Sequence, residues 1–234
     1  MVGYKKESFY YLKQKYGIKL IENDDYFFRN NHSTIYAARN YLGNTYICSS
    51  DNYFVYNPFE AEVDEPYYAA TYADSETNEW CMQVDSSGWI EKVTIGGKGK
   101  WYMLGHVFWN KEFSQRFIEI LMKEYNKPET YNKFWENIYI EHIDELKLKM
   151  RKYPKDYVFE FDSLDELRVF DSHYFIDSKS TIMRRLSEKL KCKEKDLIHI
   201  VPEKDINGNI IGFQFDKKEK KYLYIYETEE VKEC

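Results

Sequence analysis

The chain has 234 residues, a net charge of −6 and an aromatic content of 18%. This length suits one domain with an appendage, and a hydrophobic share of 43% argues against intrinsic disorder. No basic patch stands out, which disfavours a nucleic-acid partner. No apolar run reaches the roughly 18 residues of a membrane span, and no signal peptide is visible, so we expect no membrane partner. The four cysteines have no paired spacing, which indicates reduced thiols and a cytoplasmic protein.

The first fifty residues alternate between helical and extended patterns. The expected elements are helices at 5–15 and 32–42 and strands at 18–21 and 45–48. This alternation predicts a parallel α/β sheet, with the strand at 45–48 buried in it. Asp51 stands just past the end of that strand. Open α/β sheets bind ligands at the carboxyl ends of their strands, so this position is a candidate ligand site.

The middle of the chain has more strands, followed by helices. The expected strands lie at 67–72, 80–84, 89–95, 101–108 and 157–161, and the expected helices at 111–125 and 129–144. Ser163 begins a further helix, with Glu166 at the capping-box position. We place a domain boundary after residue 172, which gives a first domain at 1–172 and a small α+β tail at 173–234.

The tail is expected to contain a helix at 178–190 and a strand at 197–201. The sequence Asn207-Gly208-Asn209 between two isoleucines is a hairpin signal. The segments 213–215 and 222–226 would form its arms or a following strand pair.

Acidic residues follow two of the expected strands. Asp51 follows one, and Glu160 and Asp162 end the other. Two aspartates at the ends of neighbouring strands could hold one Mg²⁺, because Mg²⁺ prefers hard oxygen ligands that it shares with phosphates. Two structural alternatives stay open: Asp51 or Asn52 could form an Asx turn, and Asp162 could cap the helix that follows it.

Two tryptophans could bind a quaternary ammonium group. Trp80 and Trp135 offer aromatic faces for a cation–π contact, and Glu79, Glu136 or Glu160 could add a negative charge. The alternative is that both rings simply pack in the core, as aromatic residues usually do. Three isolated histidines have no metal-ligand spacing and are expected to be structural: His32, His106 and His142.

Taken together, these segments resemble the bacterial CTP:phosphocholine cytidylyltransferases of the sugar-phosphate nucleotidyltransferase superfamily. The resemblance runs from Val2 to about Phe170. It is carried by Val2 to Gly17, Asn30-Asn31, Ser50-Asp-Asn-Tyr53, Thr77-Asn-Glu-Trp80, Gly105-His-Val-Phe-Trp109, Phe134-Trp-Glu-Asn137 and Phe159-Glu-Phe-Asp-Ser163. It implies an α/β fold, a Rossmann-like mixed sheet with helices on both faces.

The resemblance also implies an activity and its residues. The family makes CDP-choline and pyrophosphate from CTP and phosphocholine with Mg²⁺. By that resemblance Asp51 and Asp162 would be the catalytic metal ligands. Four residues would contact choline: Trp80, Trp135, Glu160 and Glu79. The residues that bind the nucleotide are not identified by the sequence.

The sequence departs from the family pattern in two places. The family opens with a strand and a Gly-rich loop that cradles the triphosphate, followed by a Pro-Lys pair that carries a catalytic lysine, and this chain contains neither. We therefore expect the first βα unit to be missing, which argues against activity of this chain alone. The family's Asp-Ala-Asp-Asn turn reads Ser49-Ser50-Asp51-Asn52 here, so one acidic residue is replaced while the ligand position is kept.

Three readings follow from these departures. The first is a phosphocholine cytidylyltransferase-like enzyme. The second is a non-catalytic choline-binding or structural remnant that needs a partner chain, which predicts a homodimer, strand exchange or low stability because a sheet edge is left unpaired. The third is a superfamily member that acts on another phosphate ester. Residues 186–226 also faintly resemble the first strands of a bacterial choline kinase N-lobe, although an accessory hairpin explains them equally well.

Overall fold

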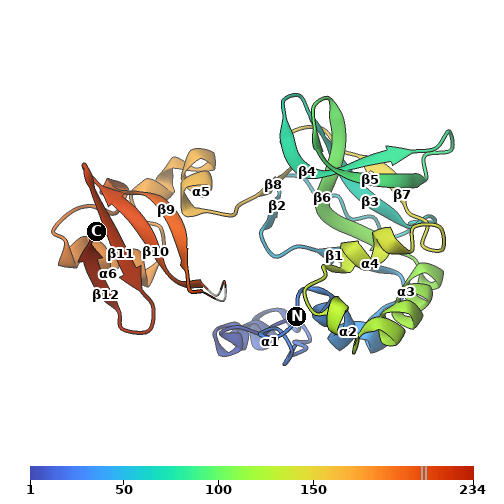
Figure 1. The fold of residues 1–234 in the computed structure, drawn as a ribbon, viewed down its shortest axis with the longest axis horizontal. Coiled ribbons are helices and arrows are strands. Elements are labelled where there is room, and N and C mark those ends of the chain that lie inside the picture. Colours follow the sequence, from blue (N-terminus) through green and yellow to red (C-terminus); the bar gives the residue numbers. More distant parts are fainter. Residues whose placement is uncertain (207, 209) are drawn as a thin grey trace. The chain divides into compact units, whose positions relative to one another are not determined.

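The computed structural model describes residues 1–206, 208 and 210–234 and divides the chain into two compact units (Figure 1). The units are Met1–Val158 and Phe159–Cys234. The division falls inside strand β8 (Val158–Glu160), which pairs with β2 (Asn52–Phe54) in a two-stranded sheet.

The division lies earlier in the chain than the boundary expected after residue 172. Helix α5 (Leu164–Phe170) belongs to the second unit because its polar side chains bind the backbone near β9 (Leu197–Lys204). The buried guanidinium of Arg168 donates to the carbonyl oxygens of Leu197 and Glu194 at 2.6 and 2.9 Å. The Asp165 carboxylate accepts the Ile200 N–H at 3.0 Å.

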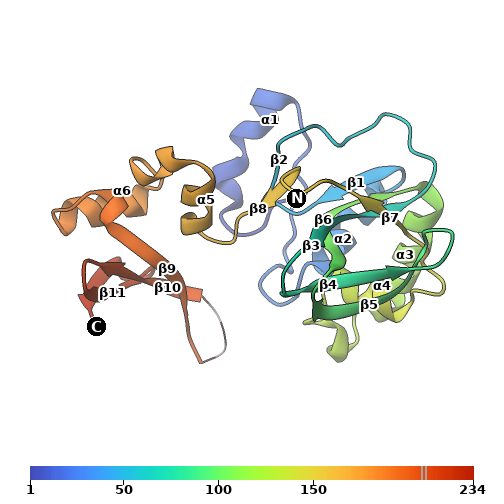
Figure 2. The ribbon, with the colours of Figure 1, turned by 90° about the horizontal axis from the view of Figure 1, so that it is seen from above.

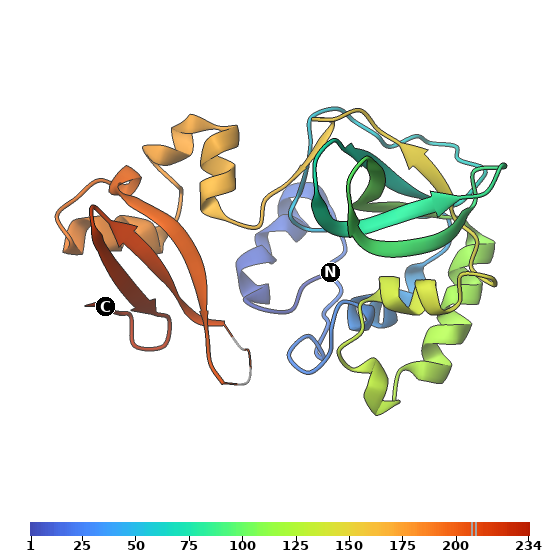
Figure 3. The same cartoon turned by 45° about the horizontal axis from the view of Figure 1, so that its top comes forward.

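A curled six-stranded mixed sheet forms the centre of the first unit (Figure 3). Its strands run in the order β5-β4-β6-β3-β7, and β1 pairs with the second half of β6. The β3–β7 pair is parallel and the other pairs are antiparallel. The strands are β1 (Thr45–Cys48), β3 (Tyr67–Ala73), β4 (Thr77–Val84), β5 (Ile90–Gly97), β6 (Lys100–Trp109) and β7 (Lys149–Lys152).

The start of the chain differs from expectation. It forms a short 3-10 turn at Lys6–Phe9, α1 (Tyr11–Tyr16), α2 (His32–Ala38) and a 3-10 turn at Arg39–Tyr41. The strand expected at 18–21 does not form, and Val2 instead makes an isolated parallel bridge with Glu22. The alternation did not produce a parallel sheet around β1, because β1 pairs with β6 from far along the chain.

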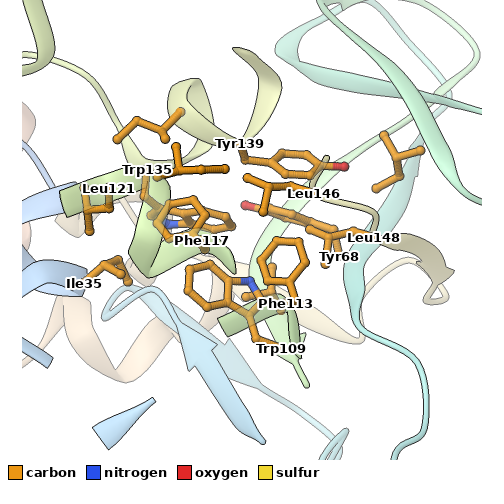
Figure 4. Close-up of a cluster of buried hydrophobic side chains, with 14 of the residues drawn as sticks. Ile35, Tyr68, Trp109, Phe113, Phe117, Leu121, Trp135, Tyr139, Leu146 and Leu148 are labelled. Atoms are coloured by element: carbon orange, nitrogen blue, oxygen red, sulfur yellow. The ribbon is translucent and has the colours of Figure 1, made fainter. Parts of the chain in front are cut away.

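Three helices pack against one apolar face of the sheet (Figure 4). They are α2, α3 (Lys111–Glu124) and α4 (Trp135–Glu141), and the cluster includes Trp109, Phe117 and Trp135. The single helix expected at 129–144 is interrupted and forms a 3-10 turn at Pro128–Thr130 and then α4. The Asn137 side chain accepts the Phe134 N–H at 2.8 Å, which fixes a new helix start.

The second apolar cluster of the first unit draws on strands and connecting segments, not on helices. It contains Tyr67, Leu104, Phe108 and Val158, with Phe54 packed against it. Among the described residues, helices α2, α3 and α4 thus cover one face of the sheet, whereas helices were expected on both faces; β2, β8 and the segments beside them contribute to the other face.

The second unit is a four-stranded antiparallel sheet in the order β12-β11-β10-β9 with helices α5 and α6 (Figure 2). Its further elements are α6 (Thr181–Lys189), 3-10 turns at Ser172–Phe175 and Glu194–Asp196, β10 (Ile210–Lys217), β11 (Lys220–Ile225) and β12 (Glu230–Glu233). The expected hairpin joins β9 to β10, although Asn207 and Asn209 of its turn lie outside the described residues. Within the described chain, every helix is too short or too polar to cross a bilayer.

Candidate functional site

A backbone turn places Asp51 between β1 and β2. The Ser49 N–H donates to the carbonyl of Gly105 in β6 at 2.9 Å, and the Asn52 N–H donates to the Ser49 carbonyl at 3.4 Å. β1 is half-buried and not buried as expected, since it pairs with β6 alone and lies outside the five-stranded path of the sheet. Asp51 is therefore exposed at the point where the chain enters β2.

Pairing of β2 with β8 brings three carboxylates together. One oxygen each of Asp51, Glu160 and Asp162 lies within 4.8 Å of the other two, and all three residues are exposed. Opposite ligands of Mg²⁺ are about 4 Å apart, because each Mg–O bond measures about 2.1 Å. Three hard oxygen donors at this spacing fit a small divalent cation after slight side-chain adjustment. The two aspartates expected to meet from distant parts of the sequence do so.

The helix-capping role that Asp162 could have had is performed by other groups. The N-cap of α5 is Ser163, whose hydroxyl accepts the Glu166 N–H at 3.2 Å. The Glu166 carboxylate accepts the N–H groups of Asp162 and Ser163 at 2.8 and 3.0 Å, so the capping box is confirmed. Asp162 contributes its backbone to this cap, which leaves its carboxylate available to a ligand.

The two tryptophans lie in different environments. Trp80 of β4 is half-buried and meets Phe134 edge to face, with ring centroids 6.1 Å apart. Trp135 is only 5% exposed, stacks on Tyr68 and meets Trp109 edge to face (Figure 4). The structure thus places Trp135 among packing residues, and the exposed neighbour of Trp80 is Phe134. Glu79 is exposed on β4.

A carboxylate at the start of α4 is held by two side chains that the sequence analysis did not connect to it. Glu136 accepts hydrogen bonds from the Asn31 amide at 3.2 Å and from the Tyr68 hydroxyl at 3.3 Å. Burial raises the pKa of Glu136 to about 7, although both donors favour the ionised form. The Asn31 Oδ1 also accepts the Trp135 N–H at 2.7 Å, so this network joins α2 to α4.

Replacement of Glu136 with Gln should remove a pH dependence of stability. The folded protein keeps the Glu136 proton up to about pH 7, whereas the unfolded chain releases it near 4.5. Folded stability therefore falls as the pH rises between these values, by about 1 to 3 kcal/mol. Urea unfolding at pH 5 and pH 8 should show Glu136→Gln gaining stability over the wild type at pH 8 only. An equal difference at both pH values would contradict this account.

The histidines expected to be structural occupy such positions. His32 is buried and bonds through Nδ1 to the Lys133 carbonyl at 2.7 Å, and His142 contacts Glu124 and Glu145. His106 is buried among aromatic rings, which lowers its pKa to about 4. Within the described residues, the acidic group at Asp51 is the only set of three side chains arranged to hold a metal ion.

The curled mixed sheet with its helices is a Rossmann-like nucleotidyltransferase fold. The solved structure of CTP:phosphocholine cytidylyltransferase from Streptococcus pneumoniae matches it with a TM-score of 0.67 at 27% identity, covering 72% of this chain and 74% of that one. No family model matches the sequence.

Individual relatives show which nucleotidyltransferases the chain is similar to. The choline-phosphate cytidylyltransferase of Streptococcus pneumoniae is 29% identical over 168 residues, which are 72% of this chain and 73% of that protein. The corresponding enzyme of Haemophilus influenzae is 28% identical over 71% of this chain and 72% of its own length. The 2-aminoethylphosphonate cytidylyltransferase of Lancefieldella rimae is 31% identical over 178 residues, which are 74% of this chain and 72% of that protein. The chain belongs to this cytidylyltransferase family.

Proposed function

We propose that this protein transfers CMP from CTP to phosphocholine and so forms CDP-choline. A phosphate oxygen of the acceptor would attack the α-phosphorus of CTP, form the new P–O–P bond and release pyrophosphate. The names of the relatives supply two acceptors, choline phosphate and 2-aminoethylphosphonate. Both acceptors join an anionic phosphorus group to a cationic nitrogen, so the site needs a place for each charge.

The observation that carries the proposal is the meeting of Asp51, Glu160 and Asp162. Asp51 and Asp162, with Glu160 beside them, would hold Mg²⁺, which when bound neutralises phosphate charge. Their exposure leaves room for a triphosphate as a further ligand. A phosphate monoester is already ionised near neutral pH, so positioning by these residues suffices and no general base is required.

For the cationic end of the acceptor, Trp80 is the better supported of the two tryptophans. Trp80 is half-buried, and its ring meets the ring of Phe134, which is 45% exposed. Aromatic faces of this kind attract quaternary ammonium groups through cation–π contacts. Glu79 and Glu160 are the acidic residues that we propose to balance the positive charge.

A choline-binding role without turnover, completed by a partner chain, is the alternative. Exposed aromatic residues near the start of the chain support it, because large apolar side chains that gather on a surface often mark interaction sites. Phe27 and Phe28 are 68% and 71% exposed, and Tyr4 is 64% exposed.

The test is pyrophosphate release by the purified chain from CTP, Mg²⁺ and either phosphocholine or 2-aminoethylphosphonate. We expect release that depends on both substrates and stops when EDTA is added. Reactions with ATP in place of CTP test the nucleotide, and the two acceptors compared at equal concentration test the preference. Absence of turnover at high protein concentration, with choline compounds still bound in calorimetry, would leave the binding role.

A further inference from the structure

At Gly105, strand β6 changes its pairing partner from β4 to β1. The φ of Gly105 is +78°, a conformation that strongly favours glycine. Before it, Tyr102 pairs with β4, and directly after it His106 pairs with Cys48 of β1. The ladder with β3 is also irregular opposite this point. A glycine inside a strand often marks a close approach of other atoms.

The atoms that approach Gly105 belong to the turn that carries Asp51. A Cβ atom at Gly105 would lie 2.9 Å from Oδ1 and 3.1 Å from Nδ2 of Asn52, and 3.2 Å from the Ser49 hydroxyl. The Ser49 N–H is bonded to the Gly105 carbonyl. Because Gly105 has no side chain, both ends of the turn, Ser49 and Asn52, can lie close to its Cα.

The side chain of Asn52 is unusual for a buried amide. Its Oδ1 and Nδ2 are inaccessible to solvent, and within the described residues neither has a hydrogen-bond partner. Burial of an unpaired amide disfavours folding, so this residue is not explained by stability. Asn52 directly follows Asp51 and opens β2, whose partner β8 ends at Glu160.

We propose that Gly105 and Asn52 are positioning residues that set the place of Asp51 relative to Glu160 and Asp162. The inference rests on the proposed metal-binding function. A side chain at position 105 would push the Asn52 amide away and move the turn. The Asp51 carboxylate would then leave the spacing at which three oxygens share one cation. Neither residue contacts the ligand in this account.

The experiment measures Mn²⁺ binding to the full chain by electron paramagnetic resonance, together with the Mg²⁺ dependence of pyrophosphate release. We expect Gly105→Ala to weaken Mn²⁺ binding by about 10- to 100-fold, as is typical when support of a metal ligand is lost. The Mg²⁺ concentration for half-maximal rate should rise by a similar factor. The rate at saturating Mg²⁺ should change less.

Gly88→Ala is the matched control. Gly88 has a similar φ of +85°, but a Cβ there would meet only Lys149 Cδ at 3.8 Å. This variant should share the backbone strain and keep wild-type Mn²⁺ binding. Asn52→Ala strains no backbone and should also weaken Mn²⁺ binding. The double variant with Gly105→Ala should bind no more weakly than Gly105→Ala alone, because the two atoms nearest to the new Cβ, Oδ1 and Nδ2 of Asn52, are gone and only the Ser49 hydroxyl at 3.2 Å remains.

Two results would overturn the proposal. Wild-type Mn²⁺ binding in both folded Gly105→Ala and Asn52→Ala would show that the turn needs no such support, and an equal loss in Gly88→Ala would assign the effect to general strain. If Gly105→Ala does not fold, Asn52→Ala decides the question by itself. A wild-type chain that binds no Mn²⁺ would instead refute the proposed metal site on which the inference rests.

Discussion

Replacement of Asp162 with Asn is expected to lower the rate of pyrophosphate release by about 10²- to 10³-fold. The variant keeps the shape of the side chain but removes one of three negative charges that lie within 4.8 Å of one another. Loss of several kcal/mol of charge stabilisation at the phosphates corresponds to this range. The measurement is initial rate against CTP and phosphocholine at fixed and then increasing Mg²⁺.

The free energy of unfolding distinguishes the loss of rate in Asp162→Asn from a folding defect. Asp162 is exposed, and the cap of α5 uses Ser163 and Glu166, so the free energy of unfolding should change by less than about 0.5 kcal/mol. Asp64→Asn removes an exposed carboxylate outside the acidic group and should retain the wild-type rate. A folded Asp162→Asn variant with the wild-type rate would show that Asp162 has no role in the reaction.

The second large effect concerns the core. Trp135→Ala should lower the free energy of unfolding by about 3 to 5 kcal/mol, the usual cost of truncating a buried aromatic side chain. Trp135 is 5% exposed and packs on Tyr68, Trp109 and Phe117 (Figure 4). All five tryptophans lie in the first unit, so their fluorescence during urea unfolding reports on that unit.

Trp80→Ala is the companion variant for this prediction. Trp80 is half-buried at the edge of the same cluster, so its loss should cost less stability than the loss of Trp135. Under the proposed function it should instead raise the phosphocholine concentration needed for half-maximal rate. A Trp135→Ala variant that is as stable as the wild type but binds choline more weakly would show that Trp135 contacts the ligand and is not a core residue.

Local chemistry explains the parts of the fold that could be predicted. The strands of the middle segment follow the alternation of apolar residues, and α3 follows helical periodicity from Lys111. Gly17 ends α1 with a positive φ of 64°, and the capping box of Ser163 and Glu166 starts α5. These signals depend on residues close in sequence, so they remain readable without tertiary contacts.

Sequence patterns did not predict the elements that depend on partners far along the chain. The segment at 18–21 has a strand pattern, but among the described residues it joins no strand, and beside it only Val2 forms an isolated bridge, with Glu22. The short strands β2 and β7 were not predicted, because each exists only through pairing with β8 or β3. Instead of one helix at 129–144, α4 starts anew at Trp135, after a side-chain cap on the Phe134 backbone that periodicity does not report.

Motif residues and their spacing were enough to indicate the family and to place Asp51, Glu160 and Asp162 after two expected strands, because both are present in the primary structure itself. Contacts between distant segments were needed to show that Glu160 joins Asp51 and Asp162, that Trp135 is core while Trp80 is half-buried, and that Glu136 is held by Asn31 and Tyr68. Burial and oxygen–oxygen spacing are set by the pairing and packing of segments far apart in the sequence, and no local pattern encodes them.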